Sequence, residues 1–410
     1  MHINMKTFKL SFSANSVYKI LAWPPIYSLL VFAVLFLKPE TAFCQDQGRT
    51  DIEMVFSSDA HYAITRKKFR GDTNVDAHIV NAAMIRQINS VPGLTLPPDG
   101  GVAAGQTVGA VDYLIQTGDI ANRMEVPYQT AAASWAQFTI DYMQSTTLKG
   151  RDGKPAKLLL APGNHDISNA IGFHRPMQPK TDPTSMVQIY NLMLHPPTPK
   201  TNADYNYATD KINYSLSIHG IHFMFITLWP DSSERIWMKK DLDTVGGKTP
   251  VIVLCHDEPT CEAKHFTNPV APHDINAQSK FENLVAEYYK EGPVAAGDDG
   301  ATDMEQRGWV KFLKQHPNIK AYFHGNSNWN EFYMYKGPDN DVALNTFRVD
   351  SPMKGKYSSK DETKLSFQLI SLDPVKQLLT ARECLWDTDP ANPAAKVVFG
   401  KVKTVSLKVE

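Results

Sequence analysis

The sequence predicts an α/β fold with a β-rich C-terminal part. Short apolar runs alternate with stretches of helical spacing through most of the chain, and Asp, His or Asn residues follow the end of four such runs. Further downstream, strand-like runs follow one another without a helical stretch between them. The alternation indicates buried strands that carry functional loops at their carboxyl ends.

Each element is predicted from its spacing of apolar residues. Strands are expected at 52–56, 113–115, 158–160, 214–218, 221–228, 251–254, 319–323, 331–335, 365–372 and 378–385, and helices at 75–88, 128–143 and 309–315. His219-Gly220 is a tight-turn signal that predicts a hairpin. Segments rich in Gly, Pro, Asn and Asp predict surface loops at 93–109, 177–206 and 265–303.

The composition is that of an ordinary folded protein. The 410 residues are 42% hydrophobic and 21% charged, and 42 basic and 43 acidic side chains give a formal net charge of -1. There is therefore no basic excess that would indicate nucleic-acid binding. No linker or repeat is visible, so 45–410 is expected to form one domain.

The N-terminal segment has the order of a secretory signal. Three lysines precede an apolar run at 26–37, and the small residues Ala42 and Cys44 stand before Gln45. We therefore expect residues 1–44 to be a cleaved signal peptide and the mature protein to be periplasmic or extracellular. Without cleavage the apolar segment would act as a membrane anchor; after cleavage no membrane association is expected.

Four polar clusters stand directly after predicted strands. In chain order they are Asp59 with His61, Asp119, Asn164-His165-Asp166, and His256. Each cluster alone is common in turns, so none of them is specific by itself. Four in succession at one edge of a sheet indicate a divalent-metal site, because carboxylate, imidazole and amide groups are ordinary metal ligands.

With these residues the chain resembles the calcineurin-like metallophosphoesterase superfamily. The motif series of that family is Asp-x-His, Gly-Asp, Gly-Asn-His-Asp/Glu, His and Gly-His-x-His, and its order and spacing match from residue 52 to about 330. The stretch 234–242 is similar to the helix that these enzymes place between the third and fourth motifs. The resemblance implies a four-layer α/β/β/α sandwich. Asn122 replaces the metal-binding Tyr of purple acid phosphatases and disfavours that branch.

The resemblance implies two divalent ions bridged by Asp119. Asp59 and His61 would bind one ion, and Asn164 and His256 would bind the other. Two such ions lower the pKa of a bridging water, and the resulting hydroxide would attack phosphorus. The implied activity is hydrolysis of a small phosphate mono- or diester.

Three further residues are implied to act on the substrate. His165 would donate a proton to the leaving oxygen as a general acid, and Asp166 would orient its ring. Arg123 stands where some relatives use Arg to hold phosphate, and a planar guanidinium suits two phosphate oxygens. A surface salt bridge is an equal alternative for Arg123.

The final motif departs from the family. His324-Gly325-Asn326-Ser327-Asn328 follows the strand, so asparagines align with both expected histidines. Asn326 would complete the ligand set of the ion bound by His256, and Asn328 would complete that of the ion bound by His61. Because amide oxygens are harder and weaker donors than imidazole, Mn²⁺, Mg²⁺ or Ca²⁺ is favoured over Zn²⁺, with iron also compatible. His324 is expected to be structural, with substitution for a lost ligand as the alternative.

The two asparagines also leave a different function open. The chain could be a non-catalytic binding protein that kept this fold after its metal site weakened. Retention of His165 argues against this alternative, because a decayed site has little reason to keep an acid catalyst beside ligands for both ions.

Overall fold

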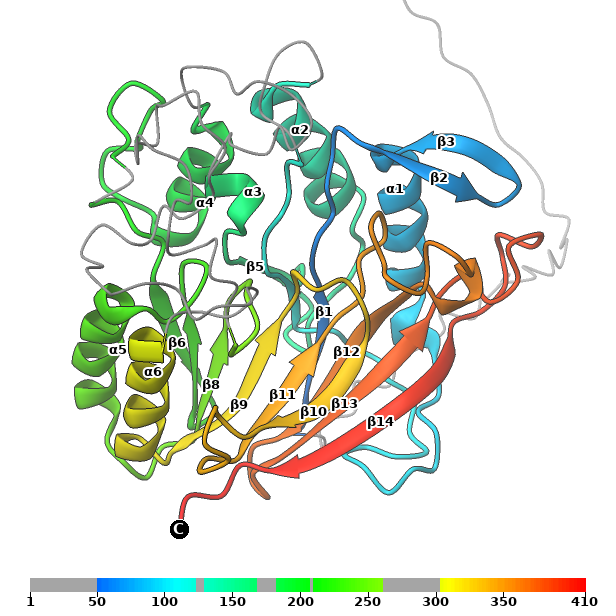
Figure 1. Ribbon diagram of the computed structural model, residues 1–410. Coiled ribbons are helices and arrows are strands. Elements are labelled where there is room, and N and C mark those ends of the chain that lie inside the picture. Colours follow the sequence, from blue (N-terminus) through cyan, green and yellow to red (C-terminus); the bar gives the residue numbers. More distant parts are fainter. Residues whose placement is uncertain (1–49, 123–128, 168–181, 207–208, 261–302) are drawn as a thin grey trace, which may run out of the picture. The chain divides into compact units, whose positions relative to one another are not determined.

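The computed structural model describes residues 50–122, 129–167, 182–206, 209–260 and 303–410, all within the unit Gln47–Glu410 (Figure 1). The predicted signal peptide and Arg123 lie outside the described residues, as does all but the last residue of the loop predicted at 265–303. In the described part, no helix is long and apolar enough to cross a membrane. Cys255 and Cys384 are buried free thiols.

Two six-stranded sheets form the framework. The first has the order β14-β13-β12-β1-β4-β5, with β1 Ile52–Ser57, β4 Tyr113–Gln116, β5 Lys157–Leu160, β12 Ser366–Asp373, β13 Leu378–Leu385 and β14 Val398–Ser406. The second has the order β10-β11-β9-β8-β7-β6, with β6 Tyr214–Ile218, β7 Ile221–Phe225, β8 Val251–Leu254, β9 Ile319–His324, β10 Glu331–Tyr335 and β11 Leu344–Arg348. A small hairpin pairs β2 Thr65–Phe69 with β3 Asp72–Asp76.

Helices connect the strands. The α-helices are α1 Ala77–Ile88, α2 Ala131–Phe138, α3 Asn164–Ile167, α4 Thr184–Leu194, α5 Ser232–Val245 and α6 Asp303–Gln315. A π-helical turn, Thr139–Gln144, continues α2, and two short 3₁₀ turns occupy Val91–Gly93 and Glu362–Lys364. Figure 1 shows α5 and α6 side by side next to the second sheet.

Parallel pairing brings the functional loops together. In the first sheet β1, β4 and β5 are mutually parallel, and in the second sheet β7, β8, β9 and β11 are parallel. The carboxyl ends of parallel strands meet at one edge of a sheet, and this is where polar side chains can be exposed without disturbing the core. The loops after β1, β4, β5, β8 and β9 carry the predicted ligands.

The core follows the two-residue period of the strands. Met54 and Phe56 of β1 join a buried cluster that also contains inward-facing residues of the second sheet, and Phe56 meets Phe323 edge to face with ring centroids 5.4 Å apart. Val55 points the other way, into a cluster with Val80 of α1. Because β1 is buried on both faces, its sequence is a nearly continuous apolar run.

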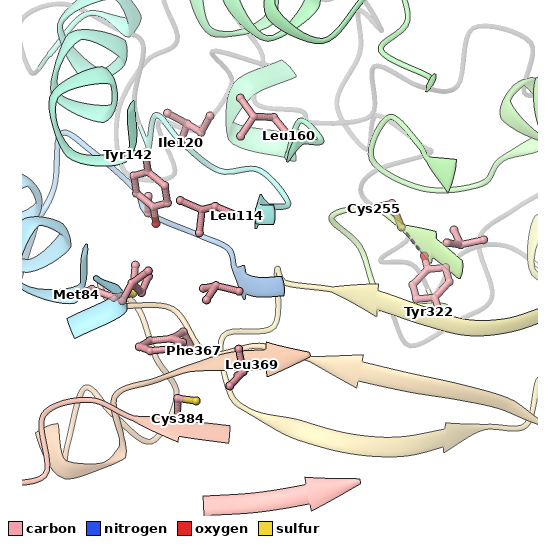
Figure 2. Packing of buried hydrophobic residues seen from close by; sticks show 14 of the residues in the cluster. Met84, Leu114, Ile120, Tyr142, Leu160, Cys255, Tyr322, Phe367, Leu369 and Cys384 are labelled. Carbon is pink, nitrogen blue, oxygen red and sulfur yellow. Dashed lines mark hydrogen bonds between the residues drawn. The ribbon is translucent and has the colours of Figure 1, made fainter. Parts of the chain in front are cut away.

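The second sheet is packed by the same rule. Val253 of β8 belongs to the cluster that includes Met238 of α5 and Trp309 of α6. At the end of β8, the thiol of Cys255 lies 2.7 Å from the hydroxyl oxygen of Tyr322 (Figure 2). Burial raises the pKa of this thiol well above 9.0, so Cys255 is an inert core residue.

Most predicted elements are confirmed, including the α/β class and the β-rich C-terminal part. His219 and Gly220 both have positive φ, 46° and 83°, as a tight hairpin between β6 and β7 requires. The loop predicted at 177–206 is wrong in its middle, because α4 occupies 184–194 and buries Met186 and Ile189. The small hairpin β2–β3 was not predicted, because its strands are mostly exposed and charged.

Candidate metal centre

The carboxylate of Asp119 lies at the centre of the candidate site. Its Oδ2 atom is 3.4 Å from Nε2 of His256, 3.6 Å from Nε2 of His61 and 3.8 Å from Nε2 of His165. Its Oδ1 atom accepts a hydrogen bond of 2.8 Å from the backbone N–H of His165. One oxygen is thus held by the backbone, and the other faces three imidazoles that come from three different strand ends.

Two groups of potential ligand atoms share this carboxylate. One group is Asp59, Asp119 and His256, and the other is His61, Asp119 and His165; all five side chains are buried. The expected pair of Asp59 and His61 is also close, because His61 Nε2 lies 3.5 Å from Asp59 Oδ1. His256 Nε2 lies 4.0 Å from the same oxygen. Asp119 belongs to both groups, as a bridging ligand does.

The imidazole of His256 is fixed by the backbone. Its Nδ1 atom lies 2.7 Å from the carbonyl oxygen of Thr117, and because a carbonyl only accepts, Nδ1 carries the hydrogen. Nε2 therefore faces the site, 3.1 Å from Oδ1 of Asn164, and becomes a ligand atom once a metal ion displaces its proton. This arrangement is typical of a metal-binding histidine, whose second nitrogen is held by a backbone or carboxylate acceptor.

Buried polar atoms at the centre fit a cation. Oδ1 of Asp59 and both ring nitrogens of His61 are buried without a hydrogen-bond partner among the described residues. Buried polar atoms without partners are rare, because losing water without replacement costs about 1–3 kcal/mol each. A divalent ion would satisfy the carboxylate oxygen and one imidazole nitrogen together.

The electrostatics of the site also favour positive charge. Burial opposes ionisation of Asp119, yet the charges of His256 and His165 hold its pKa well below 3.8. Burial alone would lower the pKa of His256, but the carboxylates of Asp119 and Asp59 raise it to about 10. For His61, burial and the charge of Lys354 lower the pKa below 6.5. The carboxylates thus attract a cation strongly at the His256 side.

Most of the predicted ligands share a strained backbone conformation with positive φ. Five of the seven predicted ligands have left-handed backbone conformations: Asp59 (φ 57°), His61 (45°), Asp119 (54°), Asn326 (57°) and Asn328 (65°). Each such conformation costs about 1–2 kcal/mol for a residue with a side chain. Asp and Asn tolerate it best, so the sharp turns after the strands favour these residue types.

Two glycines allow the loops to approach closely. A Cβ atom on Gly118, whose φ is +100°, would lie 2.1 Å from the backbone nitrogen of Gly163. A Cβ atom on Gly325 would lie 2.0 Å from Oγ of Ser58 and 2.2 Å from Oδ2 of Asp59. Any side chain at these positions would push the ligand loops apart.

The two asparagines of the final motif lie beside Asp59. The backbone N–H of Asn326 donates to Oδ2 of Asp59 at 3.0 Å, and the side-chain N–H of Asn328 donates to the carbonyl oxygen of Asn326. Oδ1 of Asn328 is buried without a hydrogen-bond partner among the described residues, so it is available to a metal ion. Nδ2 of Asn326 is also buried without a hydrogen-bond partner among the described residues, and an amide flip would put its Oδ1 in that position.

The ring of His165 is held by the backbone. Its Nδ1 lies 2.6 Å from the carbonyl oxygen of Asn122, whereas both carboxylate oxygens of Asp166 accept backbone N–H groups, from Gly163, Ile120 and Ala121. These contacts of Asp166 give no support to a direct role in orienting the ring, which stays a prediction. Both residues lie in α3, where consecutive side chains do not face each other. Burial, with a smaller contribution from Asp119, raises the pKa of Asp166 to about 7.

His324 has the contacts of a structural residue. It is fully buried, and both ring nitrogens have partners: Nδ1 lies 3.0 Å from the carbonyl oxygen of Gly325 and Nε2 lies 3.0 Å from the hydroxyl oxygen of Tyr333. Burial and the charge of Arg348 lower its pKa well below 6.5. The alternative role as a substitute ligand receives no support from this geometry.

Sequence reasoning missed Lys354 and Ser351, which follow β11. Nζ of Lys354 lies 3.4 Å from Nε2 of His165, and Oγ of Ser351 donates to the carbonyl oxygen of Asp59 at 2.9 Å. β11 is parallel to β9, so its carboxyl end lies beside the final motif. The available signal was the rule that functional residues follow strand ends, but β11 itself was not predicted.

Comparisons with known proteins place this geometry in context. The family model described as calcineurin-like phosphoesterase matches residues 58–342, and no curated protein matches the sequence. Similar solved structures include a dimetal phosphatase from Danio rerio, with 8% identity and a TM-score of 0.46 over 81% of this chain and 95% of that chain. They also include single and double mutants of Vps29 from Entamoeba histolytica, with 9% and 8% identity and TM-scores of 0.30 and 0.29, each over 86% of this chain and 98% of that chain.

Proposed function

We propose that this chain, which belongs to the calcineurin-like phosphoesterase family and is a metal-dependent phosphoesterase, is an exported hydrolase of phosphate mono- or diesters. The observation that carries the proposal is the Asp119 carboxylate, which two groups of potential ligands from four strand ends share. The binding-protein alternative is not favoured, because the matched region contains two buried groups of potential ligand atoms that share Asp119.

Asp59, His61 and Asn328 would hold one ion, Asn164, His256 and Asn326 would hold the other, and Asp119 would contribute to both. The distance of 3.5 Å between His61 and Asp59 and that of 3.1 Å between His256 and Asn164 support this division. Bound divalent ions supply an activated water and neutralise charge on the phosphoryl oxygens. Each ion keeps one imidazole among oxygen donors, so we expect Mn²⁺, Mg²⁺ or Ca²⁺ rather than Zn²⁺.

The contribution of the protein to the chemical step is made by His165. The carbonyl oxygen of Asn122 holds the Nδ1 hydrogen and turns Nε2 toward the site. When Nε2 carries a proton and no longer accepts from Lys354, that proton passes to the leaving oxygen as its bond to phosphorus breaks, and the leaving group departs as an alcohol. His165 thus acts as the general acid, and the backbone supplies its orientation.

Export is proposed from the N-terminal sequence alone. The lysines and the apolar run at 26–37 support cleavage before Gln45. Expression of the full chain followed by N-terminal sequencing of the exported product tests the cleavage point. A product that retains the apolar run and sediments with membranes would contradict it.

The activity is tested by removing metals with a chelator and restoring Mn²⁺, Mg²⁺, Ca²⁺ or Zn²⁺ one at a time. Hydrolysis of p-nitrophenyl phosphate and bis(p-nitrophenyl) phosphate is then measured for the wild type and for Asp119→Asn. We expect metal-dependent turnover that falls at least 100-fold in Asp119→Asn with an unchanged circular dichroism spectrum. Equal activity of the two proteins would refute the proposed site.

A further inference from the structure

The segment 349–365 connects β11 to β12 and contacts the metal centre at several points. The Ser351 hydroxyl donates to the carbonyl oxygen of Asp59 at 2.9 Å, and the backbone N–H of Lys356 donates to the carbonyl oxygen of Asn328 at 2.6 Å. Both acceptors belong to proposed ligands. The segment is therefore fastened to the two loops on the Asp59 side of the site.

Four further hydrogen bonds fix the backbone of this segment around Lys354. Oγ of Ser351 accepts the backbone N–H groups of Met353, at 3.2 Å, and Lys354, at 2.9 Å. The buried guanidinium of Arg66 donates to the carbonyl oxygens of Pro352, at 2.8 Å, and Ser358. The backbone of Lys354 is therefore held in place. This limits the positions that its long side chain, which has many rotamers, can reach.

The ammonium group of Lys354 is directed into the centre. Its Nζ lies 3.4 Å from Nε2 of His165, and that nitrogen lies 3.8 Å from Oδ2 of Asp119. Lys354 is half-buried, so its charge is less screened than that of a surface lysine. An anion bound beside Asp119 and His165 would lie within reach of this cation.

Building on the proposed function, we propose that Lys354 is a substrate-binding residue that contacts an unesterified phosphoryl oxygen and makes the enzyme prefer phosphate monoesters. A monoester presents three unesterified oxygens and about two negative charges, whereas a diester has fewer of both. When two oxygens face the ions, a third remains for the lysine only in a monoester. A compact ammonium suits a single oxygen of this kind.

The test uses the full Mn²⁺-loaded protein and three variants: Lys354→Met, Lys354→Arg and Lys360→Met. Lys360 is an exposed lysine of the same segment and provides a control with the same change in charge. Binding of inorganic phosphate is measured by calorimetry, and kcat and KM are measured for p-nitrophenyl phosphate and bis(p-nitrophenyl) phosphate. The two esters share a leaving group and differ in charge.

We expect Lys354→Met to weaken phosphate binding and to lower kcat/KM for the monoester at least tenfold, with less than a threefold loss for the diester. Lys354→Arg should recover most of both losses, and Lys360→Met should match the wild type. Unchanged phosphate binding in Lys354→Met, or equal losses on both esters, would overturn the proposal. If the wild type hydrolyses neither ester, the proposed function fails, and phosphate binding alone decides the role of Lys354.

Discussion

Nδ1 of His165 lies 2.6 Å from the carbonyl oxygen of Asn122, which makes the main chain the partner that orients the proposed acid. A carbonyl oxygen fixes the position of the hydrogen without carrying charge, so it leaves the imidazole free to gain or lose a proton at Nε2. A carboxylate in this place would hold the imidazolium more tightly. The proton at Nε2 is consequently easier to transfer to a leaving group.

His165→Gln should therefore reduce activity in a way that depends on the leaving group. General-acid catalysis contributes typically about 10²–10⁴-fold, and it matters least for an acidic phenol. We expect a loss of at least 100-fold with an alkyl phosphate and a loss below tenfold with p-nitrophenyl phosphate, both measured as kcat. Equal losses with the two substrates would contradict the acid role.

Asp166→Asn should act on stability rather than on proton transfer. The carboxylate accepts hydrogen bonds from the backbone N–H groups of Gly163, Ile120 and Ala121. In the Asn variant an NH₂ group replaces one of the accepting oxygens, so at least one of these backbone N–H groups loses its acceptor. We expect the free energy of unfolding to fall by about 1–3 kcal/mol in urea titrations. The ratio of alkyl to aryl phosphate turnover should stay at the wild-type value; a ratio that moves like that of His165→Gln would support the role predicted for Asp166 from the sequence.

The site residues that could be predicted from the sequence are those that follow strands with an apolar sequence. Ligands such as Asp59 and His256 follow strands buried on both faces, and such strands are readily recognised as apolar runs. Lys354 could not be found in this way, because β11 has the mixed sequence LNTFR and reaches the site only through its pairing with β9. The contacts of Asp166 were also hidden, since adjacency in sequence says little about contact within a helix.

Gly325→Ala should weaken metal binding through steric contact with a ligand. The added Cβ would meet Oγ of Ser58 and Oδ2 of Asp59 at about 2 Å, so the carboxylate must move. We expect the affinity for Mn²⁺, measured by calorimetry on the chelator-treated protein, to fall at least tenfold. Gly247→Ala is the control, because a Cβ at Gly247 has no neighbour within 4 Å. Equal affinities of the two variants would show that the close approach is not needed.

Restoring the two aligned histidines should change metal preference. In Asn326→His combined with Asn328→His, each ion would gain an imidazole in place of an amide oxygen, and imidazole favours Zn²⁺. We expect the ratio of bound Zn²⁺ to Mn²⁺ to rise at least tenfold when the metal-free protein is equilibrated with equal concentrations of both and analysed by mass spectrometry. If the wild type binds as large a ratio of Zn²⁺ to Mn²⁺ as the double variant, the proposal that both ions have mainly oxygen ligands is contradicted.

Asp350 should make stability depend on pH. Burial raises the pKa of this carboxyl from 3.8 to about 8 in the folded protein, against the opposing charge of Arg66. Between these values the folded chain holds a proton that the unfolded chain has released, so the contribution of Asp350 to stability is fully present below 3.8 and is lost as pH rises toward 8. The slope for one such group is about 1.4 kcal/mol per pH unit.

Asp350→Asn should remove this contribution, because the amide resembles the protonated carboxyl and does not titrate. Urea unfolding at pH 5, 6 and 7 would give a flatter pH dependence than that of the wild type by about 1 kcal/mol per unit. The exposed Asp389→Asn is a matched control and should keep the wild-type slope. If Asp350→Asn and the wild type show parallel slopes, Asp350 is ionised in the folded protein and Arg66 outweighs the effect of burial.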